Sequence, residues 1–193
     1  MVCDVWCVVE VSITQLTFLN SYYIGKMSDN NTEEKNQSES LINQMHKKMH
    51  KSVDKNHHDN LQRFVDAQSP VFEEVCLELQ EGRKKGHWMW FIFPHIEGLG
   101  SSPLARKFAI SSREEADAYL NHPILGPRLR HCTRLVTLVE GRSIDQIFGD
   151  PDDLKFHSSM TLFANATSDN QVFRDALHKY FGGELDRLTL ERL

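Results

Sequence analysis

Apolar residues recur every three to four positions through most of the chain after residue 60, which is the spacing of amphipathic helices. The clearest such stripe contains Val172, Phe173, Ala176, Leu177, Tyr180 and Phe181. The pair Gly182-Gly183 follows it and predicts the end of that helix, because glycine readily adopts the left-handed conformation found there. The pattern therefore predicts a helical domain.

Capping signals divide the rest of this region into further helices. Serine, aspartate or proline at the first positions of a helix satisfies or removes backbone N–H groups that lack a partner there. Such starts are predicted at Ser69-Pro70, Ser102-Pro103, Ser111 or Ser112 with Glu114 or Glu115, Gly126-Pro127, Ser143 with Gln146, and Asp150-Pro151. Gly82 and Gly141 mark two helix ends. Together these signals predict a mainly helical single domain, fold class all-α.

The segment Trp88–Phe93, WMWFIF, departs from this pattern. It is apolar at every position, so periodicity does not distinguish a buried strand from another buried segment, and Pro94 ends it. We therefore expect at most a minor β element near Trp88–Phe93.

The N-terminal part of the chain has a different composition. Residues 27–58 are rich in Asn, Ser, Glu, Lys and His and poor in large apolar side chains, so we expect a largely disordered polar segment. Met27 opens this segment and is a hypothetical natural start of the protein. The predicted organisation is an N-terminal extension at 1–58 and a helical domain at 59–193.

Histidines in the extension raise the question of a metal site. His46 and His50 are four positions apart, which would place both on one helix face, and His57 and His58 follow. No constellation of carboxylates or thiolates accompanies them, so solvated side chains are the favoured interpretation. We predict no metal and no cofactor.

Composition narrows the class of protein. Hydrophobic residues make up 40% of the chain and charged residues 25%, as in soluble globular proteins, and the net charge of −5 argues against nucleic-acid binding. Asp4 and Glu10 interrupt the apolar N-terminus and no basic region precedes it, which argues against a signal peptide or a membrane span. The four cysteines show no disulfide-framework spacing, so we expect a cytoplasmic location.

The loop GLGSSP offers a mechanism for binding an anion. Gly98 and Gly100 allow backbone N–H groups to converge, and Ser101 adds a hydroxyl donor. Basic residues before and after the loop could supply countercharge. The alternative is a plain turn that leads into a helix.

Aromatic residues precede this loop. Trp88 and Trp90 fall on one side of an extended segment and could form a wall for a flat ring, with His87 as the candidate acid or base and His95 as a ligand contact. The alternative is that the segment is ordinary hydrophobic core.

The segment DDLKFHSSMTLF carries a second group of candidates. On a helix, Lys155 and Ser159 share a face and Ser158 lies on a neighbouring one. A lysine near two hydroxyls can bind phosphate or act in proton transfer, whereas small serines can also simply permit close helix packing. The chain contains no nucleophile elbow, P-loop, zinc-finger spacing or kinase signature.

Four segments in order, HWMWFIFP, GLGSS, SREEADAYLNHPILGPRL and IFGDPDDLKFHSSMTLF, resemble the domain of unknown function 1810 family over about residues 59–193. The resemblance implies a small, mainly helical cytosolic domain with no established activity. Members usually have glutamine where this chain has His95, so a titratable ring replaces an amide. Some relatives carry the label calpastatin, which is not supported because this chain lacks the repeats of that inhibitor.

Two functional hypotheses follow. The first is a pocket that binds, or also hydrolyses, a phosphate-containing small molecule such as a nucleotide or an ADP-ribose derivative. A looser similarity to a helical family thought to process ADP-ribose-like nucleotides points the same way by analogy. Lys155 and His87 would be the catalytic candidates.

The alternative is a non-enzymatic protein-interaction module that docks an unknown protein partner. Convergence of the candidate residues into a concave polar pocket would favour the first hypothesis. Their burial as core, with a flat apolar patch elsewhere, would favour the second.

Overall fold

The computed structural model describes residues 61–193, and its regular elements there are helices with no strands, which confirms the all-α prediction. They are the helix at residues 61–68, α3 (Phe72–Gln80), α4 (Met89–Ile92), α5 (Pro103–Lys107), α6 (Arg113–Asn121), α7 (Leu125–Leu138), α8 (Ile144–Phe148), α9 (Asp152–Ala166), α10 (Gln171–Phe181) and α11 (Arg187–Leu190). The predictions for the tail histidines, for Met27 and for the domain start at residue 59 lie outside the described residues.

Several helix boundaries follow the capping chemistry expected from the sequence. Ser102 caps α5 by accepting a hydrogen bond from the Ala105 N–H at 3.1 Å, with Pro103 in the first turn. Ser143 and Gln146 form both halves of a capping box at α8. After α10, Gly182 adopts a left-handed conformation with a φ of 63°. These cap predictions are confirmed.

Several helix starts or caps differ from the prediction: α7 begins at Leu125, before Gly126-Pro127, and α9 begins at Asp152, after Asp150-Pro151. α3 begins at Phe72 rather than at Ser69-Pro70, because the Ser69 hydroxyl donates back to the Val65 carbonyl at 2.7 Å and so belongs to the end of the preceding helix. At α6, Ser112 is the cap, but the Glu115 carboxylate accepts from the backbone and hydroxyl of Ser111 instead of completing a capping box.

The apolar segment Trp88–Phe93 folds into the short helix α4. The β contact in this part of the domain lies further on, as an isolated parallel bridge between Ile96 and Ile110. The Ile110 N–H donates to the His95 carbonyl at 3.0 Å, and the Glu97 N–H donates to the Ile110 carbonyl at 2.8 Å. This bridge fixes the chain that leaves α4.

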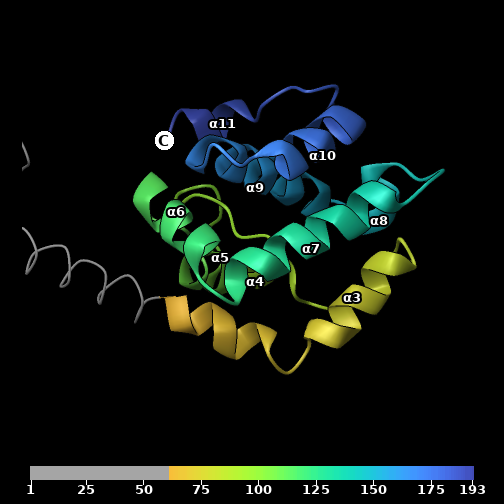
Figure 1. The fold of residues 1–193 in the computed structure, drawn as a ribbon, viewed down its shortest axis with the longest axis horizontal. Helices are drawn as coiled ribbons and strands as arrows, with labels where there is room; N and C mark the ends of the chain where they lie inside the picture. Colours follow the sequence, from red (N-terminus) through yellow and green to blue (C-terminus); the bar gives the residue numbers. More distant parts are fainter. Residues whose placement is uncertain (1–60) are drawn as a thin grey trace, which may run out of the picture. The chain divides into compact units, whose positions relative to one another are not determined.

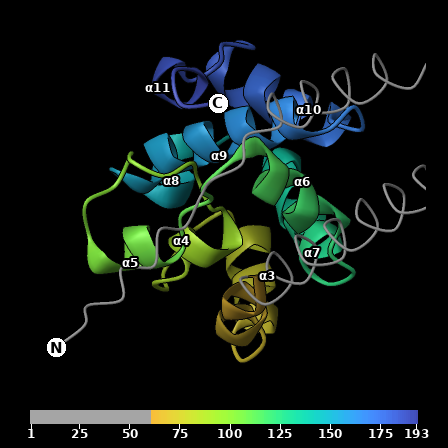
Figure 2. The same ribbon diagram turned by 90° about the vertical axis from the view of Figure 1, so that its left-hand side faces the viewer.

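Helices α7 and α9 form the middle of the domain (Figures 1 and 2). In both views α10 and α11 lie at one end, and α3 lies at the other end with the helix at 61–68. α9 packs against α6, α8, α10 and α11, and α7 packs against α3, α4, α6 and α10. Both long helices therefore carry core side chains.

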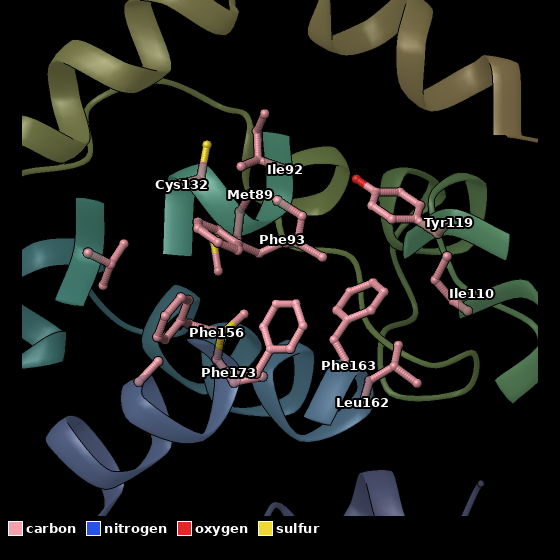
Figure 3. Packing of buried hydrophobic residues seen from close by; sticks show 14 of the residues in the cluster. Met89, Ile92, Phe93, Ile110, Tyr119, Cys132, Phe156, Leu162, Phe163 and Phe173 are labelled. Carbon is pink, nitrogen blue, oxygen red and sulfur yellow. The ribbon is translucent and has the colours of Figure 1, made fainter. Parts of the chain in front are cut away.

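Aromatic side chains dominate the core between these helices (Figure 3). The Phe156 ring of α9 lies 5.0 Å from Phe93 in an edge arrangement and 5.0 Å from Phe148 in a stacked one. Phe163 continues the row toward Tyr119, at 5.4 Å between ring centres. α9 is thus held from several sides.

No helix among residues 61–193 has the length and apolar character that a membrane crossing requires.

Candidate functional site

The turn that leads into α4 is anchored by a buried carboxylate. Glu78 of α3 accepts hydrogen bonds from the Lys85 N–H at 2.7 Å, from the Gly86 N–H at 3.0 Å and from the Trp88 indole at 2.9 Å. Burial alone would raise the pKa of Glu78, but these donors lower it below its ordinary value. The carboxylate therefore fixes where α4 begins.

Trp88 lies in the core. Its side chain is 3% exposed, its indole N–H is engaged by Glu78, and its ring meets Phe148 edge-on at 6.2 Å. The ammonium of Lys84 lies over the Trp88 ring, 5.3 Å from the ring centre. Trp88 thus contributes packing and a cation–π contact.

Trp90 is more open than Trp88. It is only partly buried, and the ammonium of Lys155 from α9 lies 4.8 Å from its ring centre. Lys155 also donates to the Asp152 carboxylate at 2.6 Å, three residues earlier on the same helix. The aromatic segment and the lysine segment, which the sequence presents separately, therefore meet here.

Asp152 is shared by two lysines. Its second carboxylate oxygen lies 2.8 Å from the ammonium of Lys84. Burial acts to raise the pKa of Asp152, but the hydrogen bonds from Lys155 and Lys84 and their charges outweigh it, so the pKa is lowered. Two ammonium groups thus share this carboxylate, and the charge of Lys84 also acts on the Glu78 carboxylate. Asp152 also occupies the first turn of α9, where a negative charge is favourable.

His95 is 4% exposed and lies within reach of the Lys155 charge. Its Nδ1 is 3.1 Å from the Ile96 carbonyl, and because a carbonyl only accepts, Nδ1 carries the hydrogen and Nε2 the lone pair of the neutral ring. Burial lowers the pKa of His95, and the charge of Lys155 acts in the same direction, against smaller opposing effects of the Ile96 hydrogen bond and of Asp186. His95 is therefore held as a neutral acceptor.

The glycine loop borders the His95 ring. A Cβ at Gly100 would lie 3.5 Å from Cε1 and 3.8 Å from Nε2 of His95, and only 2.5 Å from the Cβ of Ala105. A side chain at this position would therefore crowd α5 and cover the imidazole. At Gly98, with a φ of 87°, the neighbour is Arg192 near the C-terminus, 3.2 Å from a Cβ placed there.

Ser158 and Ser159 have different surroundings. The Ser158 hydroxyl donates to Asp186 at 2.8 Å, and Asp186 also accepts from the Thr189 hydroxyl at 2.6 Å and caps α11. Ser158 thereby ties α9 to the C-terminal segment. Ser159 is fully buried, and its hydroxyl has no hydrogen-bond partner in the described part of the chain.

Two of the remaining candidates are exposed to solvent. His87 is exposed in the turn before α4, and Ser101 is exposed with its carbonyl accepting a hydrogen bond from Arg106. The structure thus joins Trp90, Asp152, Lys84 and Lys155 by direct contacts, with His95 within reach of the Lys155 charge and Gly100 beside the His95 ring. We call these six residues the Lys155 cluster.

A small cavity lies away from the Lys155 cluster, toward the C-terminal half of α9. Its volume is about 100 Å³, and it is lined by Ala164, Asn165, Arg174, Leu177, His178, Gly183 and Leu185. Pockets for drug-sized ligands are larger, roughly 300–1,000 Å³.

In residues 61–193 no three side chains of His, Cys, Asp or Glu gather as a metal site.

A model of the family described as "Protein of unknown function (DUF1810)" matches residues 58–193. The chain belongs to this family. The DUF1810 region is also similar to the crystal structure of the conserved hypothetical protein Rv1873 from Mycobacterium tuberculosis, with 62% identity and a TM-score of 0.69. That match covers 69% of this chain and 96% of the other. A comparison with curated proteins gave no significant match.

Sequence reasoning missed three acidic residues of this DUF1810 domain. Glu78 sits on an otherwise apolar stripe, Asp152 opens α9, and Asp186 precedes the last helix. Each orients a neighbouring candidate: Trp88, Lys155 and Ser158, respectively. The available signals were an acidic residue among apolar ones and acidic residues at helix starts, which indicate capping at least as often as function.

Proposed function

We propose that this DUF1810 domain binds a small phosphate-containing molecule, such as a nucleotide or an ADP-ribose derivative, at the Lys155 cluster, in the cytoplasm. The observation that carries the proposal is the pairing of two ammonium groups, of Lys84 and Lys155, with the single carboxylate of Asp152. The charge of Lys84 also acts on the Glu78 carboxylate, so the ammonium of Lys155 is the group that would attract an anion. An ammonium group has three N–H donors, and Asp152 accepts from one of those of Lys155.

The other members of the cluster fit the rest of such a ligand. Trp90 is only partly buried, so a base or a similar flat ring would stack on the part of its ring that Lys155 leaves uncovered. The Nε2 of His95 would accept a hydrogen bond from a hydroxyl of the ligand, and Gly100 leaves that side of the ring uncovered by a side chain. If the domain also hydrolyses its ligand, Nε2 of His95 is the group in this cluster suited to take a proton from water.

The test is isothermal titration of the full chain with inorganic phosphate, nucleotides, NAD and ADP-ribose. Lys155→Ala is expected to weaken binding of the active compound at least tenfold, because a charge-assisted contact to phosphate is lost. Lys85→Ala is the matched control, since Lys85 is an exposed lysine paired with Glu81. Binding by none of these compounds, or equal loss in both variants, would contradict the proposal.

A second candidate function, a protein-interaction module, is supported by the C-terminal segment. Leu185, Leu188, Leu190 and Leu193 are between 40% and 53% exposed within nine residues. Exposed apolar side chains so close together are typical of surfaces that meet another protein. If no small molecule binds, affinity capture with wild-type and Leu188→Ser protein tests this second candidate. We expect wild-type protein to capture a protein partner that Leu188→Ser does not capture.

A further inference from the structure

Helices α3 and α7 run side by side in the same direction. At the start of α3, the Phe72 ring lies beneath the guanidinium of Arg128, 4.5 Å from ring centre to Cζ. Beyond the end of α3, a Cβ at Gly82 would lie 2.8 Å from Cγ1 of Val139. Later residues of α3 thus meet later residues of α7, which fixes the register of the pair.

This register places two cysteines opposite each other. Cys76 follows Phe72 by four residues, Cys132 follows Arg128 by four, and residues four apart share a helix face. The two thiols are close enough for each to influence the pKa of the other. The sulfur of Cys132 points away from the aromatic rings of the core (Figure 3).

The two thiols differ in exposure and in acidity. Cys76 is partly exposed and Cys132 is buried. The neighbouring Cys132 thiol, aided by His131 and Arg128 and opposed by burial, lowers the pKa of Cys76 to about 6. The Cys76 thiol and burial raise the pKa of Cys132. Cys76 is therefore the accessible thiolate of the pair, and the thiolate is the reactive form of cysteine.

We propose that Cys76 and Cys132 form a redox modification site, in which a hydroperoxide oxidises Cys76 and Cys132 then closes a disulfide between α3 and α7. The Cys76 thiolate attacks one peroxide oxygen, the O–O bond breaks, and with one proton the products are a sulfenic acid and water or an alcohol. The Cys132 sulfur attacks the sulfenic sulfur, the S–O bond breaks, and water leaves with the thiol proton. In total, two thiols lose two electrons and the peroxide gains them.

Reduction returns the pair to its starting state. Two external thiols deliver two electrons through thiol–disulfide exchange and leave as their own disulfide. The disulfide would covalently join the two helices near their middle, far along the chain from one another. Transient pairs of this kind are compatible with a reducing compartment. The inference is independent of the proposed ligand site.

The test is hydrogen peroxide treatment of the reduced full chain, followed by non-reducing peptide mapping with mass spectrometry. The expected main product is a peptide pair linked through Cys76 and Cys132, which dithiothreitol separates. In Cys132→Ala, whose fold is checked by circular dichroism, the sulfenic acid at Cys76 should persist and react with dimedone. Wild-type protein that oxidises Cys76 to the sulfinic acid without linking it to Cys132, or that leaves Cys76 unoxidised, would overturn the proposal.

Alkylation by iodoacetamide gives a second readout. At pH 6, native Cys76 should react roughly tenfold faster than the same residue in urea-unfolded protein, because its larger thiolate fraction outweighs the weaker nucleophilicity of a more acidic thiol. An equal or slower rate in the native protein would count against Cys76 as the attacking residue.

Discussion

The ammonium of Lys155 lies 4.8 Å from the centre of the Trp90 ring. This contact joins the first turn region of α9 to the short helix α4, although the two residues are far apart in the chain. The same ammonium is also held by Asp152 at 2.6 Å, and Asp152 pairs with Lys84 as well. Replacing Asp152 therefore changes the charge of the Lys155 cluster without altering either lysine.

Replacing Asp152 by asparagine should have opposite effects on stability and on ligand affinity. Lys84 and Lys155 would lose their shared carboxylate, so we expect the free energy of unfolding to fall by about 1–3 kcal/mol. The extra net positive charge should at the same time strengthen phosphate binding several-fold. Urea unfolding and isothermal titration measure the two effects. Weaker phosphate binding by Asp152→Asn than by wild type would argue against a phosphate at Lys155.

The lowered pKa of His95 predicts a pH dependence of stability. As the pH falls from about 6.5, the unfolded chain takes up a proton on His95 before the folded chain does, which favours unfolding. His95→Gln removes this group, so its free energy of unfolding should fall less than that of wild type between pH 7.5 and pH 5. Urea unfolding at both pH values measures the difference. His87→Gln, which changes an exposed ring, is the control and should follow wild type.

Glu78→Gln should destabilise the turn before α4. The amide would present N–H groups to the backbone donors of Lys85 and Gly86, so we expect a loss of about 1–3 kcal/mol at pH 7. The pKa of Glu78 is lowered in the folded protein, so its stabilisation is present above the unfolded value near 4.5 and is lost as the pH falls through the folded value. The difference between the variant and wild type should therefore shrink toward pH 3. A difference that is unchanged at low pH would exclude the charged carboxylate as its source.

Among the glycines of residues 61–193, Gly126 is the one where the backbone leaves least room for a side chain. A Cβ there would lie 2.0 Å from the Leu120 carbonyl oxygen, which is backbone and has little freedom to move. Gly126→Ala should lower the free energy of unfolding by more than about 3 kcal/mol, by forcing α6 and α7 apart. Gly141→Ala is the comparison, because no atom lies within 4 Å of a Cβ there and only the φ of 70° opposes a side chain. We expect Gly141→Ala to lower the free energy of unfolding by about 1 kcal/mol. Equal melting temperatures for the two variants would contradict this account.

The sequence predicted the helices best where local chemistry determines their ends. Ser102, the pair Ser143 and Gln146, and Gly182 act through atoms within a few residues, so their roles are visible without tertiary information. The start of α3 was predicted too early, because Ser69 has two possible partners and the choice depends on the preceding helix. For the same reason the sequence did not identify α4, whose start depends on Glu78.

The candidate site was predictable only as a set of segments. Lys155 and Trp90 each stand out in the sequence, but their contact depends on the packing of α9 against distant elements. Asp152 looks like an ordinary acidic residue in a first helical turn until the structure places Lys84 beside it. The sequence likewise did not predict the cysteine pair. Cys76 and Cys132 each occupy an apolar position of a helical stripe, and only the parallel register of α3 and α7 places them opposite each other.

The contact of Arg192 with Gly98 affects how the protein should be prepared. Residues fused after Leu193 would emerge beside the glycine loop that borders His95, because Arg192 lies 3.2 Å from a Cβ at Gly98. An affinity tag at that end could compete with a small molecule for the loop and lower its apparent affinity. Binding assays should therefore use protein with a free C-terminus, or a tag that is cleaved before measurement.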